Sequence, residues 1–311
     1  MLSHMARARG RDLPPMMARI MENTGIERRH IAMPPEYYFT GRSWSDRAKI
    51  YEQHASLLFR DAAEKALLRA KLVPADIGQI VCVSTTGMMT PGLPSRMITE
   101  MGFGANTRTV PVFGYGCAGG VIGLGLATDL WRAMPDKPVL LVAVELCSLA
   151  YDHSHLDKKD MVAASLFADG CAAAVIGAGQ GPALGVFSQN LWPDTRDMMG
   201  WEIGETGFDL LLARNIPKFV EQEFAPVCDA FLSGQGLNRS DIGEPACHPG
   251  GGRVVDALAG YFGNNLPVTR RILASYGNMS SPTVLFILDA MLAAGLPEAP
   301  ILMTALGPGF V

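Results

Sequence analysis

One stretch of the sequence combines a cysteine with surroundings that could make it a nucleophile. Residues 109–131 read TVPVFGYGCAGGVIGLGLATDLW, in which an apolar run and a glycine-rich turn lead to Cys117 and then to small residues with helical periodicity. This order predicts that Cys117 lies at the N-terminus of a buried helix. Unpaired backbone N–H groups and the positive end of the helix dipole favour a thiolate there. The sequence therefore predicts that Cys117 is a nucleophile that carries an acyl group.

Two further polar side chains lie in loops of the same design, in which a predicted strand leads through small residues into a helix. His248 stands in ACHPGG (246–251), and Asn278 stands in SYGNMSS (275–281). Active sites of α/β proteins form where such loops converge. A thiol that attacks an acyl donor, an imidazole that keeps it ionised and an amide that holds an oxyanion form a consistent chemical set. Taken singly, each residue is more often a packing or turn residue, so the prediction depends on all three together.

The cysteine turn also matches a competing pattern. Gly114, Gly116 and Gly119 form GxGxxG between a predicted strand and a helix, and Glu145 ends the next predicted strand, as in a dinucleotide-binding fingerprint. However, the motif follows a long segment that already contains strands and helices. A nucleotide site would also leave the histidine and asparagine loops without a role. We therefore favour acyl chemistry.

The elements around these loops alternate between strands and helices, which predicts a layered α/β fold with a mostly parallel sheet. The rhythm repeats after residue 180 and predicts two related halves, 1–180 with Cys117 and 181–311 with His248 and Asn278. Residues 11–32 are predicted to form a helix followed by a charged turn at 28–30. The other predicted helices are 45–72 with Ser45 as N-cap, a short one ending at 101, 118–131, a short one from 161, one after 217, one after 252, and 282–294. The predicted strands are 80–84, 110–113, 139–145, 172–176 after a turn at 169–170, 184–188, one leading into 246–247, 271–275 and 301–305; residues 189–216 are predicted to be irregular.

Composition excludes several classes of function. The 311 residues are 49% hydrophobic and 18% charged, which indicates a globular protein with a large buried fraction or one that buries surface in an oligomer. A net charge of −4 without a basic patch argues against a nucleic-acid partner. The six cysteines show no CxxC pairing and lie in apolar settings. Residues 1–25 lack a secretory signal. No apolar stretch is long enough to span a bilayer, so we expect a cytoplasmic location without a membrane partner.

Five motifs, in order along the chain, resemble those of type III polyketide synthases, the chalcone synthase-like branch of the thiolase fold. They are GCAGG (116–120), SLFADGCAAAVIG (165–177), HPGG (248–251), YGNMSS (276–281) and GPGF (307–310). The resemblance implies a thiolase-like fold with two duplicated βαβαβ-type halves in a layered α-β-α-β-α arrangement. It implies a homodimer that condenses an acyl-CoA starter with malonyl-CoA. By this resemblance Cys117 is acylated, and His248 with Asn278 stabilises the thiolate, the enolate and the oxyanion. It implies no metal and no bound cofactor, because the CoA thioesters bring their own activation.

The resemblance assigns weaker roles to five more positions. Phe167 matches the aromatic gatekeeper between the CoA tunnel and the cavity, and Leu210 falls where plant members have a second gate phenylalanine. An aliphatic residue there suits longer acyl chains. Arg19 falls where a basic residue contacts the CoA phosphates. Thr90 replaces a methionine that plant members insert into the partner's cavity, and Ser280 keeps a cavity serine.

Two segments, VELCSL (144–149) and MMGWEIGETGFDLLLARNIP (198–217), resemble bacterial members that make alkylpyrones or alkylresorcinols from fatty acyl-CoA. The sequence differs from the family in showing no strand before Arg19 and in stopping at Val311, so we expect the first and last strands to be missing. Two alternatives stay open: a truncated inactive homologue, and another thiolase-fold condensing enzyme such as a ketoacyl synthase III or a hydroxymethylglutaryl-CoA synthase-like enzyme.

Overall fold

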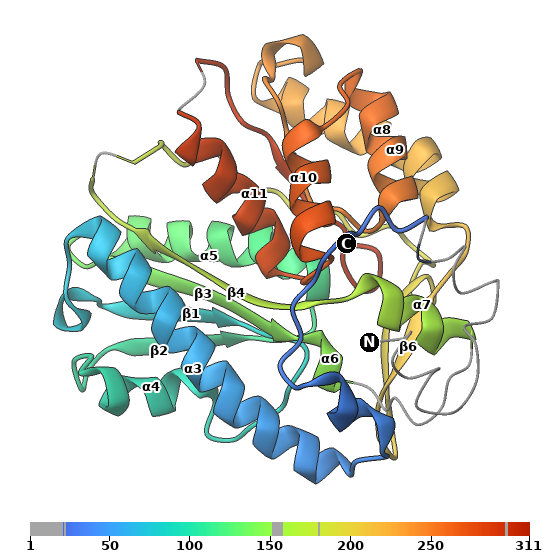
Figure 1. The fold of residues 1–311 in the computed structure, drawn as a ribbon. Helices are drawn as coiled ribbons and strands as arrows, with labels where there is room; N and C mark the ends of the chain where they lie inside the picture. The colour runs from blue at the N-terminus through green and yellow to red at the C-terminus, as the bar shows by residue number, and fades with distance from the viewer. Residues whose placement is uncertain (1–20, 22, 151–157, 180, 296–297) are drawn as a thin grey trace.

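The computed structural model describes residues 21, 23–150, 158–179, 181–295 and 298–311 (Figure 1). Its helices are α3 (Trp44–Ala70), α4 (Leu93–Met101), α5 (Gly119–Ala133), α6 (Cys147–Ala150), α7 (Lys158–Leu166), α8 (Ile216–Gly234), α9 (Gly252–Phe262), α10 (Pro267–Tyr276) and α11 (Pro282–Ala293). Its strands are β1 (Gln79–Val83), β2 (Arg108–Val112), β3 (Val139–Leu146), β4 (Asp169–Ile176), β5 (Met199–Gly204), β6 (Gly207–Leu212), β7 (Ala246–Cys247) and β8 (Met303–Thr304). Short 3-10 turns occur at Pro35–Phe39, Pro74–Asp76, Gly116–Ala118 and Arg239–Asp241.

A four-stranded sheet with the order β2-β1-β3-β4 forms the centre of the first half. β1 runs parallel to β2 and β3, and β4 runs antiparallel to β3. Side chains of β3 alternate between the two faces: Leu140 and Val142 pack in the cluster under α3, whereas Leu141 and Ala143 pack in the cluster under α5. Because successive side chains of a strand point to opposite faces, this run of apolar residues is buried on both sides.

The second half adds two small sheets and four helices. β7 pairs in parallel with β8, and α10 and α11 enclose this pair through Ala246, Ile272 and Ile287. β5 and β6 form an antiparallel hairpin. Figure 1 shows α5 and α11 between the four-stranded sheet and the group formed by α8, α9 and α10. The layers therefore run helix, sheet, helix, strand pair, helix, as expected for the layered fold.

One helix boundary needs correction. Residues 23–34 form turns and coil, in agreement with the charged turn expected at the end of the segment 11–32, and the helix expected before it falls largely on residues 1–20 and 22, outside the described part of the chain. α3 is capped by Ser43 instead of Ser45, because Ser43 Oγ accepts a hydrogen bond of 3.1 Å from the backbone N–H of Asp46. An N-cap acceptor satisfies one of the donors that a helix start leaves unpaired.

The predicted strand at 184–188 is wrong, and a hairpin was missed. Residues 184–188 belong to no strand, and the ring of Phe187 packs on Gly125 of α5, where a Cβ would lie 2.9 Å from it. The segment 189–216, predicted to be irregular, contains β5 and β6. Its glycines hide the alternation that would reveal strands.

A predicted strand at 271–275 belongs to helix α10. Pro267 occupies the first turn of this helix and Gly277, with φ 74°, ends it; proline at the start and glycine past the end are typical helix boundaries. The short apolar run between them does not distinguish strand from helix. β4 begins at Asp169, paired with Leu146, so the predicted turn at 169–170 is strand.

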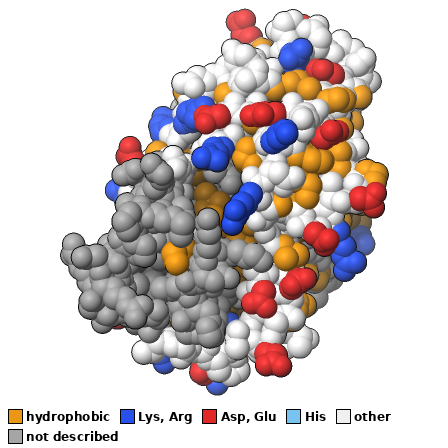
Figure 2. Space-filling model, turned by 90° about the vertical axis from the view of Figure 1, so that its right-hand side faces the viewer, with side chains coloured by type: hydrophobic (Ala, Val, Ile, Leu, Met, Phe, Trp, Pro, Cys, Tyr) orange, Lys and Arg blue, Asp and Glu red, His pale blue; other side chains and the backbone are white. Residues whose placement is uncertain are grey.

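The described part of the chain shows no helix long and apolar enough to cross a membrane. Figure 2 shows lysine and arginine side chains interspersed with aspartate and glutamate on the face that it displays. The side chains that the figure colours form no continuous basic surface of the kind that binds nucleic acid. The division between residues 180 and 181 stays a prediction.

Candidate active site

Cys117 lies in a tight turn between β2 and α5. The turn is a single 3-10 segment, Gly116–Ala118, that continues directly into the helix. Gly116 has φ 45°, and a Cβ there would lie 2.8 Å from the ring of Pro308, so the turn accepts only glycine at this position. The N–H of Gly116 donates to Thr85 Oγ1 at 3.0 Å. The sequence prediction of a buried cysteine at a helix start is thus matched by the geometry.

Asn278 approaches Cys117 from the second half of the chain. Cys117 Sγ lies 3.8 Å from Asn278 Oδ1 in donor geometry, and the backbone N–H of Ser280 donates to the same oxygen at 2.8 Å. Asn278 is 1% exposed. It follows helix α10 rather than a strand, which corrects the predicted setting of the loop but leaves the asparagine beside the thiol.

Backbone hydrogen bonds join the segment that carries Phe167 to Asn278. Phe167 and Asn278 form an isolated parallel bridge, in which the N–H of Ala168 donates to the carbonyl of Asn278 at 2.8 Å and the N–H of Asn278 donates to that of Leu166 at 3.1 Å. The two residues therefore keep a fixed relation to each other. Movement of one backbone segment would move the other.

His248 follows β7, as predicted, and its N–H donates to the carbonyl of Thr304 at 2.8 Å. The side chain is 3% exposed, and within the described residues neither ring nitrogen has a hydrogen-bond partner. Burial lowers the pKa of His248 to about 3, so the ring is neutral. A buried polar atom without a partner costs roughly 1–3 kcal/mol, and such a cost in a folded protein calls for a functional explanation.

Burial also favours the neutral thiol of Cys117. The pKa of the thiol is raised from 9.0 to about 12, chiefly by burial; a hydrogen bond with Ser280 lowers it, the nearby carboxyl of Glu145 raises it, and the hydrogen bond with Asn278 lowers it. Three pKa units correspond to about 4 kcal/mol, whereas a helix terminus supplies about 0.3–2 kcal/mol. Burial therefore outweighs the helix dipole and disfavours the thiolate that the sequence predicts.

A small cavity of about 20 Å³ lies beside Cys117, with Phe167, Trp201, Leu210 and Ser280 in its wall. A water molecule needs about 10–15 Å³ by this measure, so the space holds one water but no acyl chain. The structure thus brings Phe167, Leu210 and Ser280 to the cysteine as predicted. Trp201 was not predicted; it is the cross-strand partner of Leu210, and its ring lies 5.9 Å from that of Phe167.

The resemblance assigned Thr90 to the partner's cavity and Arg19 to the CoA phosphates, and both assignments stay predictions. Thr90 is exposed in the loop before α4 and does not line the cavity beside Cys117. Arg19 lies outside the described residues.

Glu145 is a buried carboxyl whose role the sequence analysis missed. Its Oε2 accepts hydrogen bonds from the N–H groups of Thr85 and Thr86, each at 3.0 Å, and from Thr86 Oγ1 at 2.7 Å, while Ser281 Oγ donates to Oε1 at 2.9 Å. Burial raises its pKa to about 7. The signal was present, since Glu145 is the only charged residue of β3. It joins the loop after β1 to the residue before α11.

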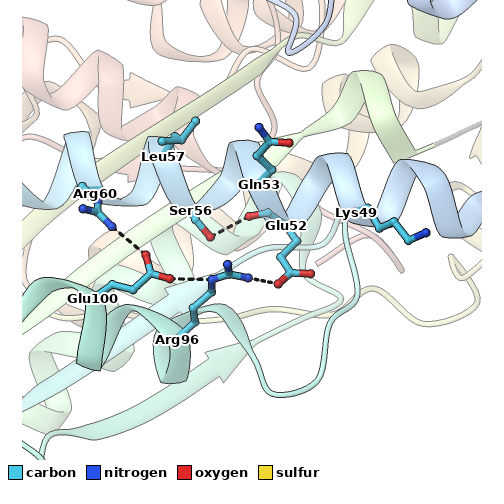
Figure 3. A pocket seen from close by; sticks show the side chains of 8 residues that line it. All are labelled: Lys49, Glu52, Gln53, Ser56, Leu57, Arg60, Arg96 and Glu100. Carbon is cyan, nitrogen blue, oxygen red and sulfur yellow. Dashed lines mark hydrogen bonds and ion pairs between the residues drawn. The ribbon is translucent and has the colours of Figure 1, made fainter.

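A larger hollow of about 380 Å³ lies on the surface between α3 and α4 (Figure 3). Most of its charged side chains pair with one another: Glu100 accepts from Arg60 and from Arg96, each at 2.8 Å, and Arg96 also contacts Glu52. No thiol or imidazole lines it among the described residues. The groups that can perform acyl chemistry are those around Cys117.

The chain matches the family model for the N-terminal domain of chalcone and stilbene synthases over residues 15–180, and that for the C-terminal domain over residues 183–303. The chain belongs to the chalcone and stilbene synthase family. A 1,3,6,8-tetrahydroxynaphthalene synthase of Streptomyces peucetius subsp. caesius is 34% identical over 307 residues, which are 95% of this chain and 81% of the relative. The alpha-pyrone synthesis polyketide synthase-like Pks18 of Mycobacterium tuberculosis is 34% identical over 258 residues, which are 79% of this chain and 65% of the relative.

Among solved structures, the 1,3,6,8-tetrahydroxynaphthalene synthase of Streptomyces coelicolor A3(2), a bacterial type III polyketide synthase, matches with a TM-score of 0.92 and 34% identity over 99% of this chain and 90% of its own. The resemblance to type III polyketide synthases and the thiolase-like fold are thereby confirmed. The chain is an acyltransferase of the malonyl-CoA-condensing type.

Proposed function

We propose that this type III polyketide synthase loads a fatty acyl group from CoA onto Cys117, extends it with malonyl-CoA and releases a pyrone or a resorcinol. One observation carries the proposal: a buried thiol lies 3.8 Å from Asn278 Oδ1, in a protein whose buried His248 has both ring nitrogens unbonded within the described residues. These are the three groups that acyl transfer through a thioester requires.

In the loading step, Cys117 Sγ attacks the carbonyl carbon of the acyl-CoA thioester. The bond from that carbon to the CoA sulfur breaks, and the thiol proton passes to His248 and then to the departing CoA thiolate. Because burial keeps the thiol and the imidazole neutral, proton transfer accompanies substrate entry instead of preceding it. The amide of Asn278 would stabilise the oxyanion with its N–H groups.

In the extension step, the bond between the malonyl carboxylate and its neighbouring carbon breaks, and CO₂ leaves. The electron pair forms an enolate that His248 and Asn278 stabilise. The enolate carbon attacks the thioester on Cys117, and the thiolate of Cys117 is released while the longer chain stays on CoA. Each step uses side chains of this protein and the two thioesters, so we propose that the enzyme needs no metal and no bound cofactor.

The enzyme acts, in this proposal, as a homodimer. β2 is an edge strand of the four-stranded sheet, and an unpaired edge is a template for association. Phe113, directly after β2, is 50% exposed, and Met88, in the loop after β1, is 43% exposed. The N–H of Ser84 donates to the carbonyl of Val112 at 3.1 Å, which keeps the two segments side by side.

A second product class is favoured by a different observation. The cavity of about 20 Å³ beside Cys117 offers no room for a fatty chain, and a relative with 34% identity makes tetrahydroxynaphthalene. A chain assembled from malonyl units alone would give a polyhydroxylated aromatic product without a long tail.

One experiment distinguishes the two product classes. The protein is incubated with malonyl-CoA, alone and together with starters from hexanoyl-CoA to palmitoyl-CoA, and the products are identified by mass spectrometry. The leading proposal predicts products whose mass rises with the length of the starter. A single product that forms from malonyl-CoA alone, and that no starter changes, would select the second class. If neither products nor free CoA appear under any of these conditions, both proposals are wrong.

A further inference from the structure

Arg47 is a buried cation that ties three segments together outside the cavity. It lies in the first turn of α3 and is 3% exposed. Its guanidinium donates to backbone carbonyls of Arg42 at 2.9 Å, of Leu149 in α6 at 3.1 Å, and of Thr206. The flat guanidinium fork carries five N–H donors and can serve three directions at once, which an ammonium on a flexible stem does poorly.

Thr206 lies at the tip of the β5–β6 hairpin, in the two-residue turn between Gly204 and Gly207. A Cβ placed on Gly207 would overlap Nη2 of Arg47 and lie 3.1 Å from the carbonyl oxygen of Ala150. Gly207 also has φ 141°, a backbone conformation that residues with a side chain rarely adopt. The hairpin tip therefore rests directly on Arg47 and α6.

The same hairpin forms one wall of the cavity at Cys117, through the cross-strand pair Trp201 and Leu210. Phe208 of this hairpin packs edge-on against Trp44, with ring centres 5.7 Å apart. Trp44 begins α3, so one helix turn holds the hairpin through a ring contact and through the hydrogen bond of Arg47 to Thr206. A fatty acyl chain fits beside Cys117 only if the cavity wall moves.

We propose that Arg47 is a positioning residue that limits how far the β5–β6 hairpin can recede, and so decides which acyl chain lengths the enzyme accepts. Arg47 does not line the cavity; it acts through Thr206 and the hairpin. The part of this inference that concerns chain length rests on the proposed function. The part that concerns the hairpin does not, because hairpin opening can be measured without substrate.

The experiment compares Arg47→Gln and Arg47→Lys with Arg60→Gln. Arg60 lies on the same helix, and its side chain is 42% exposed and pairs with Glu100. Two quantities are measured: hydrogen exchange of the amides in 199–212 relative to α8, and the ratio of kcat/KM for palmitoyl-CoA to that for hexanoyl-CoA. In Arg47→Gln we expect exchange in the hairpin to rise about tenfold and the ratio to rise about fivefold, because local opening controls exchange. Arg47→Lys should give a smaller change, and Arg60→Gln none.

Unchanged exchange in 199–212 overturns the inference, and so does a loss of activity that lowers kcat/KM equally for both starters. If Arg47→Gln does not fold, Gly207→Ala replaces it, since the added methyl pushes the hairpin tip away while the cation remains. Gly207→Ala should raise exchange and the kcat/KM ratio in the same direction, and failure to do so also overturns the inference. If the wild-type enzyme accepts no acyl-CoA starter, the proposed function is wrong, while the exchange measurement still decides the role of Arg47.

Discussion

Cys117 and His248 are uncharged because each is buried, which raises the thiol pKa to about 12 and lowers the imidazole pKa to about 3. A preformed thiolate–imidazolium pair would react readily with small electrophiles near neutral pH. A neutral thiol reacts with them slowly, through the small fraction that is ionised. This distinction can be measured on the protein alone.

We predict that alkylation of Cys117 by iodoacetamide accelerates about tenfold per pH unit between pH 7 and pH 10, because the reactive thiolate is a small fraction that grows with pH. The rate is read from the mass of the peptide that contains Cys117, with Cys117→Ser as the control for labelling elsewhere. A rate that is already constant above pH 6 would show a preformed ion pair and contradict the neutral site.

Glu145 makes the stability of the fold depend on pH. Its pKa rises from 4.5 in the unfolded chain to about 7 in the buried site, so the folded protein holds this proton more tightly than the unfolded chain does. The resulting stability is complete below pH 4.5 and is lost as the pH rises to about 7, a loss of about 3 kcal/mol. Asp169, whose pKa burial raises to about 6, adds a loss of the same sign.

Glu145→Gln should therefore make the free energy of unfolding less dependent on pH. We expect the free energy of unfolding to fall by about 2 kcal/mol less between pH 5 and pH 7.5 in this variant than in the wild type, as measured by urea denaturation. Glu223→Gln, an exposed change on α8, should leave the wild-type slope intact. Equal slopes in Glu145→Gln and the wild type would mean that Glu145 is ionised in both states.

At the scale of elements, hydrophobic periodicity predicted most of the first half. The apolar runs at β1 and β3 predict strands, and the periodicity at α3 predicts a helix. The structure has these elements because tertiary packing agrees with the local pattern there. The pattern was ambiguous at 271–275, where an apolar run of only three residues, 272–274, fits a strand as well as a helix. It failed at β5 and β6, where glycines interrupt the alternation.

The site was predictable where a loop follows a strand, as for Cys117 and His248, because glycine and proline mark such turns. Asn278 was found through its neighbours in sequence, although the element before it is a helix. The size of the cavity was not predictable, because Trp201 reaches it from the unrecognised hairpin. The hydrogen bonds of Arg47 were not predictable either. Their acceptors are backbone carbonyls, which every residue has, so no sequence pattern indicates them.

The side chain of Trp201 should limit the size of the cavity beside Cys117. Trp201→Ala removes an indole from the cavity wall, and we expect the preferred starter to become longer, as read from the product masses with mixed acyl-CoA starters. Ile203→Ala, two residues along β5 with a side chain that is 64% exposed, is the matched control and should leave the product profile unchanged. If both variants or neither change the profile, the hairpin is not the wall that limits chain length.

At the scale of the molecule, the four-stranded sheet is covered on both faces but open at β2. We predict that the wild type sediments as a dimer and that Phe113→Asp raises the dimer dissociation constant about tenfold or more, because a charge replaces an exposed ring beside this edge. Leu68→Asp changes a side chain that is 79% exposed on α3 and should not affect association. A monomeric wild type, or equal effects of the two variants, would contradict dimerisation through β2.

The central claim is that Cys117 carries the acyl group during condensation, and the mass of the intact protein tests it most directly. After incubation with an acyl-CoA starter and without malonyl-CoA, the account predicts a mass increase equal to the acyl group, located on the peptide that contains Cys117, with release of free CoA. Cys228→Ala, a change in α8 within a separate hydrophobic cluster, should form the same adduct, and Cys117→Ser should form none. An adduct on another residue, or product formation by Cys117→Ser at the wild-type rate, would contradict the account.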